Sequence, residues 1–271
     1  MPGHWSPEEL PWEAFDSERV DQGLIPLVKA ASMVESNGRD YAAYLNRVFA
    51  DDAQVCDMMN GWAHEEVQHG VVLGRWAMLA DPDFDYDAAL ARFRAGYAIR
   101  TDVDASIRGS RTGEMIARCM VEVGTSSFYS ALADRTDEPL LKAICRRIAA
   151  DELRHYALFY RTMKRYLATE RLNRFQRIRI AFLRVLETED DELAYAWFAA
   201  NDGSGHGYDR KRSNRAYMRE SYPLYRPHHT RRSMTMIFKA VGLKPTGYLS
   251  RVLSMLAIAL MGFRARRLAR A

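Results

Sequence analysis

Residues 62–70 read WAHEEVQHG, and residues 148–155 read IAADELRH. Each stretch places a glutamate three residues before a histidine, as Glu66 with His69 and as Glu152 with His155. Two side chains at this spacing lie on the same face of a helix, and a carboxylate with an imidazole suits iron or manganese. A single Glu-x-x-His pair is a weak indication, because such pairs are common on exposed helices. The residues around each pair therefore decide its meaning.

Both pairs fall in the middle of an apolar stripe with alternating steps of three and four residues, which is typical of a helix in a bundle core. The stripe residues are Val55, Met59, Trp62, Leu73 and Trp76 around the first pair, and Leu141, Cys145, Ile148 and Phe159 around the second. A buried carboxylate costs several kcal/mol unless it is paired or bound to a metal. Two pairs at matching core positions therefore predict one shared metal site.

Two further glutamates lie on apolar helical stripes, Glu35 within 24–50 and Glu122 within 111–135. Taken alone, each is also compatible with an acid at a helix interface. The order Glu, Glu-x-x-His, Glu, Glu-x-x-His is that of the ferritin-like dimetal bundles. We therefore expect six metal ligands: Glu35, Glu66, His69, Glu122, Glu152 and His155. Glu65 competes with Glu66 because it lies four residues before His69, but it falls off the stripe and is expected to support a ligand.

The whole sequence predicts an all-α protein, a ferritin-like four-helix bundle with additional helices and a C-terminal helical extension. The chain has 271 residues, 48% of them hydrophobic. Helices are expected over roughly 24–50, 53–80, 86–100, 111–135, 137–168 and 172–200, with a last helix from Tyr248 to the end. Ser6-Pro7-Glu8-Glu9 predicts a short capped helix. We expect a metal-binding bundle over 1–200, and over 201–271 an irregular loop (201–230) and a basic helix packed on or beside the bundle.

The amino-acid composition indicates which binding partners the protein has and in which cellular compartment it is expected. The net charge of +4 mixes both signs and indicates no nucleic-acid partner. Cys56, Cys119 and Cys145 fall in helical patterns and are expected to be free thiols of a cytoplasmic protein. The N-terminus shows no secretory signal. Arginine is enriched over 209–232 and 264–270, which favours an acidic partner, either an anionic membrane surface or an acidic protein.

The tail 248–271 has two interpretations. It mixes apolar residues with five arginines: Arg251, Arg264, Arg266, Arg267 and Arg270. The tail is expected either to dock on the bundle with a solvated basic end, or to lie on a membrane surface. Its apolar run over 255–263 is too short to span a bilayer. We therefore expect a peripheral membrane contact at most.

Around the expected ligands the sequence resembles the soluble acyl carrier protein desaturases. WAHEEVQHG at 62–70 is similar to that family's Glu-Glu-Asn-Arg-His-Gly segment, and IAADELRH at 148–155 is similar to its Ala-Asp-Glu-Lys-Arg-His-Glu segment. The likeness covers roughly residues 25–168 and implies the same six ligands. It also implies that Thr125 lies beside the oxygen-binding face and that Asp151 hydrogen-bonds a ligand histidine. These two are the expected catalytic residues besides the ligands.

The resemblance implies an oxygen-dependent diiron oxidoreductase of fatty acyl chains, with desaturation as the expected reaction and hydroxylation as an alternative. The implied cofactors are two iron ions, or a manganese–iron pair, with dioxygen as co-substrate and an external electron donor such as a ferredoxin. The implied partners are an acyl substrate on an acidic carrier protein and a second copy of the chain in a homodimer. The sequence departs from the family at Val67, Gln68, Leu153 and Tyr156, and after residue 200.

Two other functions compete with this one. An amine N-oxygenase would use a related centre, but the sequence lacks the third histidine that resemblance to those enzymes would place near the second motif. A ferritin-like iron-binding or iron-oxidising protein would need similar ligands, but the long extension after the fifth helix exceeds a minimal storage shell.

Two smaller features stay open to interpretation. Residues 124–127 read GTSS, and such small side chains either leave room for oxygen and substrate beside the metal or allow close helix packing. His228 and His229 adjoin in the segment expected to be irregular, and both are expected to be surface histidines.

Overall fold

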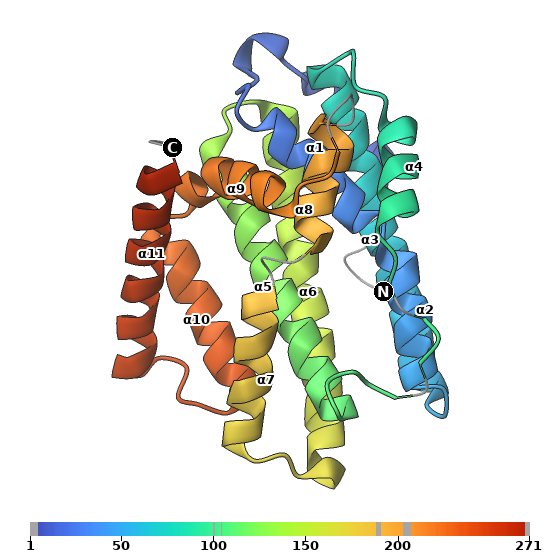
Figure 1. Ribbon diagram of the computed structural model, residues 1–271, viewed down its shortest axis with the longest axis vertical. Helices are drawn as coiled ribbons and strands as arrows, with labels where there is room; N and C mark the ends of the chain where they lie inside the picture. The colour runs from blue at the N-terminus through green and yellow to red at the C-terminus, as the bar shows by residue number, and fades with distance from the viewer. Residues whose placement is uncertain (1–4, 100, 104, 188–190, 203–206, 269–271) are drawn as a thin grey trace.

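The computed structural model describes residues 5–99, 101–103, 105–187, 191–202 and 207–268. Within these residues it contains helices and no β-strand, which confirms the all-α prediction. The bundle is formed by α1 (Ile25–Glu35), α2 (Gly38–Val48), α3 (Ala53–Ala80), α5 (Arg111–Arg135) and α6 (Pro139–Glu170) (Figure 1). The N-terminal segment contains 3-10 turns over Pro7–Glu9, Trp12–Ala14 and Ser17–Arg19. The first is the predicted capped turn, in which the Ser6 backbone N–H donates to Glu9.

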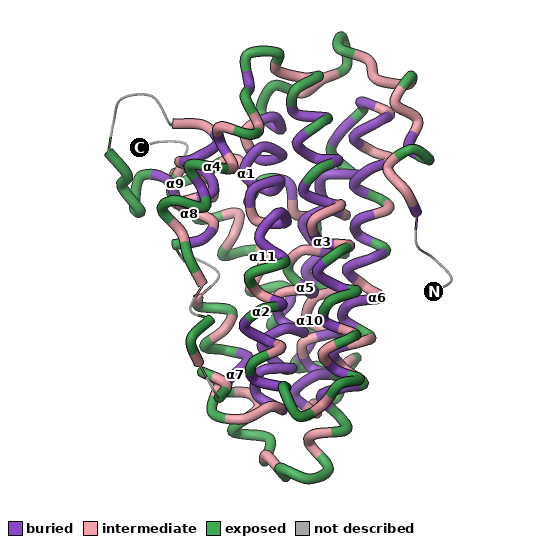
Figure 2. The backbone as a smooth tube through the Cα atoms, turned by 90° about the vertical axis from the view of Figure 1, so that its right-hand side faces the viewer, coloured by how far each residue is buried: buried purple, intermediate pink, exposed green. Residues whose placement is uncertain are grey.

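The apolar core consists of two clusters of buried side chains along the bundle. Figure 2 shows buried residues distributed along the bundle helices. One cluster includes the α3 residues at 72–77 and the α6 residues at 140–149. The other includes the α3 residues at 55–63 and the α6 residues at 156–163. The Glu-x-x-His pairs lie between these segments on both helices. The two clusters therefore enclose a polar layer at the middle of the bundle and keep bulk water away from it.

The predicted helix over 24–50 was wrong in one respect, because it is broken at Ser36 and Asn37 into α1 and α2. Serine and asparagine have low helix propensity because their side chains compete for backbone hydrogen bonds. The Ser36 hydroxyl donates to the Ser32 carbonyl and also hydrogen-bonds the Tyr86 hydroxyl, both at 2.7 Å. The Asn37 amide donates to Glu192, 3.1 Å away. These contacts stabilise a break that directly follows the last residue of α1.

The second half of the chain differs more from the sequence-based expectation. Helix α4 (Tyr86–Gly96) is shorter than predicted, and the region 172–200 contains α7 (Arg174–Leu186), α8 (Asp191–Trp197) and the start of a π-helix (Phe198–Asp202). The segment 201–230, predicted to be irregular, contains α9 (Arg210–Ser221), a 3-10 turn (Tyr222–Leu224) and the start of α10 (Pro227–Val241). The Asp209 side chain caps α9 by accepting from the Arg212 N–H. Asp209 and Pro227 are residue types that commonly start helices. The segment was nevertheless predicted to be irregular because it is rich in Gly, Arg, Tyr, Pro and His.

The last predicted helix is present as α11 (Tyr248–Leu268). Helix α10 docks on the bundle, where the Tyr156 hydroxyl donates to the Met236 carbonyl at 2.8 Å and the Ser127 hydroxyl hydrogen-bonds the Ser233 hydroxyl at 2.5 Å. Helix α11 runs antiparallel beside α10 at one edge of the molecule (Figure 1). Among the described residues, α11 alone is long and apolar enough to cross a membrane, judged by length and composition, with a mean hydropathy of 1.3. The division into 1–200 and 201–271 stays a prediction.

Candidate metal centre

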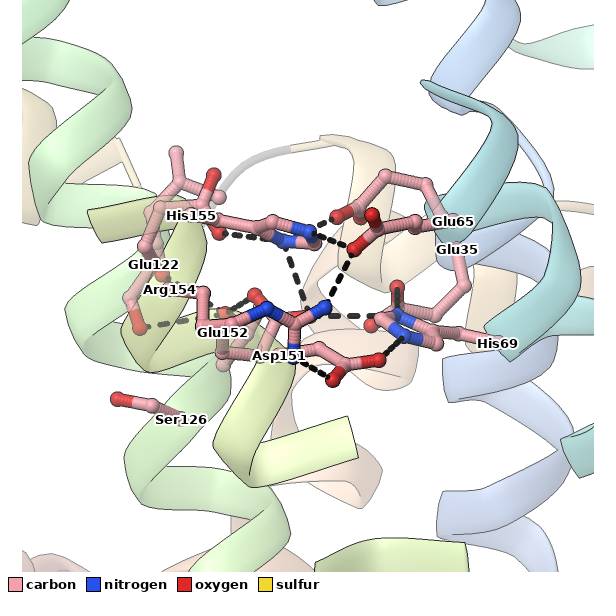
Figure 3. Close-up of polar contacts among 12 residues, drawn as sticks. Glu35, Glu65, His69, Glu122, Ser126, Asp151, Glu152, Arg154 and His155 are labelled. Atoms are coloured by element: carbon pink, nitrogen blue, oxygen red, sulfur yellow. Dashed lines mark hydrogen bonds and ion pairs between the residues drawn. The ribbon is translucent and has the colours of Figure 1, made fainter. Parts of the chain in front are cut away.

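The six predicted ligand side chains meet in the polar layer, although they come from four different helices. Atoms that could bind a metal lie within 4.8 Å of one another in two overlapping groups of four residues. One group is Glu35, Glu66, His69 and Glu152, and the other is Glu66, Glu122, Glu152 and His155. All six residues are buried. Because Glu66 and Glu152 belong to both groups, the arrangement offers two adjacent metal positions with two shared carboxylates. Figure 3 shows Glu35 and His69 on one side of Glu152 and Glu122 on the other.

Both histidines direct Nδ1 toward these carboxylates. His69 Nδ1 lies 3.3 Å from Glu152 Oε1 and 3.5 Å from Glu35 Oε2. His155 Nδ1 lies 3.0 Å from Glu66 Oε1 and 3.7 Å from Glu122 Oε2. The two imidazole centroids are 6.0 Å apart. The donor atoms therefore surround a compact space, with one histidine on each side of it.

The donor set fits two metal ions, because its inward atoms lie close to one another, at 3.0 Å for His155 Nδ1 and Glu66 Oε1, without forming well-aligned hydrogen bonds. Buried atoms without a partner include Glu35 Oε2, Glu66 Oε1, His69 Nδ1, both carboxylate oxygens of Glu122, Glu152 Oε1 and His155 Nδ1. Leaving a buried polar group unsatisfied costs about 1–3 kcal/mol, and more when the group is charged. Concentrating all of these groups at one point would be strongly unfavourable without a ligand that satisfies them. Two divalent cations would satisfy them and would balance the four carboxylate charges.

The atoms on the far side of the ligands are held by hydrogen bonds. Glu35 Oε1 accepts from the Tyr129 hydroxyl, and Glu152 Oε2 accepts from the Thr125 hydroxyl, both at 2.5 Å. These bonds fix the outer oxygen of each carboxylate and leave its partner oxygen directed inward. Thr125 thus lies beside the centre, as the resemblance implied, although its catalytic role stays a prediction. Tyr129 lies on the same apolar stripe as Glu122, which predicts its inward position, but its hydrogen bond to Glu35, 94 positions away, was not predicted.

Each histidine is also oriented by a carboxylate. Asp151 Oδ2 lies 2.9 Å from His69 Nε2, and Glu65 Oε2 lies 2.8 Å from His155 Nε2. When Nε2 donates its hydrogen to a carboxylate, a neutral imidazole retains the Nδ1 lone pair for a metal. Asp151 and Glu65 therefore occupy the supporting positions expected for them.

Arg154 connects the two supporting carboxylates. Its guanidinium forms an ion pair with Asp151 through Nη1 and lies 3.0 Å from Glu65 through Nη2 (Figure 3). Trp5 adds a further donor, since its Nε1 lies 2.8 Å from Asp151 Oδ2 and its ring stacks on His69 at 6.1 Å. Sequence reasoning missed both residues. Arg154 could have been found, because it lies within the second motif and on the same turn as Asp151.

Two glycines allow the helices to approach the ligands. A Cβ at Gly38 would lie 2.6 Å from Glu66 Cβ, and a Cβ at Gly70 would lie 2.8 Å from the Ser36 backbone nitrogen. Real Cβ atoms essentially never approach so closely. Both positions therefore require glycine if α2 and the end of α1 are to lie against the ligand-bearing part of α3.

The small residues after Glu122 serve different purposes. A Cβ at Gly124 would have nothing within 4 Å, so close packing does not explain this glycine. Ser127, in contrast, is buried against α10 through its hydrogen bond to Ser233. Ser126 is buried as well, and its carbonyl accepts from Arg232 of α10 at 3.0 Å. The close-packing interpretation therefore applies to Ser126 and Ser127.

The expectation for the adjoining histidines was wrong for His229, which is buried. His229 and the exposed His228 both lie against Asp134, with Nε2–Oδ2 distances of 3.2 and 3.0 Å. His229 Nδ1 accepts the Arg226 backbone N–H at 3.0 Å, at the start of α10. A neutral His229 therefore carries its hydrogen on Nε2 and has no lone pair there for a metal. This group caps and docks α10.

Burial and charge shift the protonation of the centre. Burial and the neighbouring Glu152 and Glu35 carboxylates raise the pKa of Glu66 well above its usual 4.5. Burial and Glu152 likewise raise the pKa of Glu122. Burial opposes ionisation of Glu152 as well, but His155 and His69 outweigh it and hold the pKa of Glu152 well below 4.5. In the metal-free protein, protons on Glu66 and Glu122 therefore replace part of the missing positive charge.

Metal binding is expected to stabilise the protein more strongly as the pH rises from about 6 to about 8. A carboxyl group whose pKa is raised by folding contributes stability at low pH and loses it as the pH rises through the folded pKa. The metal-free protein therefore loses stability as the pH rises, while competition between protons and metal weakens. Each proton released should widen the gap in Tm by about 2–3 °C per pH unit. Calorimetry with Mn²⁺, compared with chelator-treated protein, measures this gap, and a constant gap would contradict the assignment.

Comparison with known proteins agrees with these observations. A sequence model of the fatty acid desaturase family matches residues 36–179, which is more than half of the chain. The matched region contains five of the six candidate ligands and begins one residue after Glu35. No curated protein matches the chain. The family suggests iron use, which suits the buried glutamates and histidines of the centre. The chain therefore belongs to the fatty acid desaturase family and is an oxidoreductase of the desaturase type.

Proposed function

We propose that the protein is an oxygen-dependent diiron desaturase that acts on a fatty acyl chain attached to a carrier protein. The observation that carries the diiron part is the set of buried carboxylate and imidazole atoms that lack a hydrogen-bond partner and lie in two overlapping groups. Membership of the fatty acid desaturase family supports the acyl substrate. The ferritin-like topology, the carrier protein and the identity of the metals belong to the proposal.

The residues divide into two sets of ligands. Glu35 and His69 would hold one iron, Glu122 and His155 would hold the other, and Glu66 and Glu152 would be shared. When bound, two ferrous ions supply the capacity to reduce dioxygen and to oxidise an unactivated C–H bond, which acid–base side chains cannot do. Desaturation removes two hydrogens from the chain and reduces dioxygen to two waters. The balance requires two further electrons and two protons, which is why an external donor such as a ferredoxin is part of the proposal.

The protein's own contribution is orientation and exclusion of water. Asp151 and Glu65 fix the imidazoles of His69 and His155 with Nδ1 directed inward. Thr125 holds the outer oxygen of Glu152, and because it is half-buried its hydroxyl lies close to the edge of the centre. The apolar clusters above and below the polar layer protect it from bulk solvent. Such outer contacts are worth roughly 10–100-fold in metal affinity or activity.

Metal analysis with a single-turnover assay tests the proposal. The purified protein is expected to contain two irons per chain and to elute from gel filtration as a homodimer. After reduction, it should take up oxygen faster when an acyl chain on acyl carrier protein is added. Mass spectrometry should show a product that has lost two hydrogens. A product that has gained one oxygen would instead show hydroxylation, and a cage-sized assembly with many irons per chain would contradict the proposal.

Manganese–iron occupancy is distinguished in the same experiment. If the centre holds a manganese–iron pair, protein purified from cells supplied with both metals would contain one manganese and one iron per chain. Two irons per chain under these conditions would support the diiron form.

A further inference from the structure

Helix α11 presents an apolar surface that nothing in the described chain covers. Its packed side faces α10, where Ser250 and Ser254 are its only buried residues. The outward side carries five large exposed side chains at alternating steps of four and three: Leu249, Leu253, Leu256, Leu260 and Phe263. Met255 and Tyr248 are exposed beside them. Soluble surfaces rarely expose contiguous apolar side chains on this scale unless they bind something.

The charge of the surrounding region is strongly one-sided. The chain has 39 basic and 35 acidic residues, yet the last acidic residue is Glu220. Residues 221–271 therefore contain ten arginines and lysines and no acid, while residues 1–220 contain 29 basic and 35 acidic residues and carry a net charge of −6. Helices α10 and α11 make up most of this cationic segment, so they form a positively charged hairpin on a bundle of the opposite sign.

We propose that the outward face of α11 binds the surface of an anionic membrane. The exposed leucines and Phe263 would enter the boundary between headgroups and acyl chains, and the arginines at both ends of the helix would lie among anionic headgroups. This combination of apolar area with basic charge is what interfacial helices use. The proposal does not depend on the metal centre, because no ligand or supporting residue lies on α10 or α11.

The charge of α10 and α11 argues against two other binding partners for the outward face of α11, a second copy of the chain and an acidic protein. A second copy of the chain could pair with the leucine row, but each copy would bring a cationic hairpin without acids to the contact. An acidic protein would satisfy the arginines but would leave the exposed leucines without a hydrophobic partner. An anionic bilayer provides both complements at once.

Although α11 as a whole is long and apolar enough to cross a membrane, the position of its arginines and its packing favour a place on the membrane surface. Arg251 and Arg264 bracket twelve uncharged residues, 252–263, which extend about 18 Å at 1.5 Å per residue. The hydrocarbon core of a bilayer is about 30 Å thick. In addition, α11 packs against α10, which is itself hydrogen-bonded to α5 and α6. A peripheral position leaves this packing intact.

Vesicle sedimentation with the full chain tests the proposal. The protein is expected to bind vesicles of phosphatidylcholine with phosphatidylglycerol, to bind pure phosphatidylcholine much more weakly, and to be released by 0.5 M NaCl (about a 3–5 Å screening length). The double variant Leu256→Ser with Leu260→Ser should bind anionic vesicles about tenfold more weakly. Arg266→Gln with Arg267→Gln should lower the partition coefficient about 25-fold at low salt, since each arginine near such a surface contributes about fivefold.

Matched variants on another face control for general effects. Val71 and Leu79 of α3 are 47% and 42% exposed, compared with 59% and 52% for Leu256 and Leu260. Val71→Ser with Leu79→Ser, and Arg39→Gln with Arg94→Gln, should leave vesicle binding unchanged. Circular dichroism checks that each variant is folded.

Several outcomes would overturn the proposal. One is unchanged vesicle binding by the serine variant of α11. Another is binding to neutral vesicles that equals binding to anionic ones, or that persists in high salt as an embedded helix would. A third is that the serine variant of α11 still binds vesicles but no longer forms a dimer. The same holds if it still binds vesicles but no longer binds acyl carrier protein.

Discussion

Replacing Glu152 with alanine is expected to abolish binding of both metals and to reduce desaturase activity by more than about 100-fold. Glu152 belongs to both groups of candidate ligands, so its loss should exceed the roughly 10–100-fold effect of losing a residue that merely supports a ligand. Glu66→Ala should behave in the same way for the same reason. Elemental analysis of the purified variants, together with oxygen uptake on acyl substrate, measures both effects.

The folded state should survive the Glu152 replacement. Glu152 helps to raise the pKa of Glu66 and of Glu122, so its removal relieves crowding of charge in the metal-free protein. Helical content should therefore be unchanged. The wild type should gain about 5 °C in Tm when iron is present at 100 times its dissociation constant, whereas the variant should gain nothing.

Glu114→Ala is the matched control for removing a buried acid. Glu114 is buried on α5 and accepts from the Tyr44 hydroxyl at 2.7 Å, but it lies outside both ligand groups. This variant should lose stability and keep its metals. Retention of both metals in Glu152→Ala or in Glu66→Ala would refute the assignment of the centre.

Replacing Arg154 with alanine is expected to weaken metal binding and activity by about 10–100-fold although Arg154 contacts no candidate inward ligand atom. Its guanidinium bridges Asp151 and Glu65, which orient the two histidines. Without it, two carboxylates lose their shared cation, and both imidazoles lose a fixed partner. Lysine at this position should recover only part of the function, because an ammonium group cannot bridge two carboxylates as a planar guanidinium does.

Arg147 provides the matched control for Arg154. It lies on the same helix, its side chain is 36% exposed compared with 37% for Arg154, and it forms an ion pair with Glu9. Arg147→Ala should leave metal affinity unchanged, because exposed ion pairs contribute little. Equal losses for Arg147→Ala and Arg154→Ala, measured by competition with a metal chelator, would show that the bridge has no special role.

The meeting of the six candidate ligands could be predicted because the information about them is local. Helical periodicity places Glu66 and His69 on one face, and the apolar residues around them make that face the buried one. A buried carboxylate requires a partner, so four buried carboxylates and two histidines on four helices are expected to lie together. Helix starts with strong caps were equally readable, as at Asp52, whose side chain accepts from the Val55 N–H.

The features that were missed depend on contacts between distant parts of the chain. The break after Glu35 is stabilised by Tyr86 and Glu192, 50 and 155 residues away from their partners. Trp5 lies 146 residues from Asp151. No periodicity or propensity encodes such pairs. The helices within 201–230 were missed for a different reason, because α9 buries only Ser213 and Ser221 and so lacks an apolar stripe.

The absence of side chains at positions 38 and 70 gives a criterion for sorting other sequences. A chain can retain both Glu-x-x-His pairs and still be unable to assemble the centre. A methyl group at either position would push α1 or α2 away from α3. Screening for these two glycines together with the six ligands would separate competent oxidases from relatives that preserve the motifs alone.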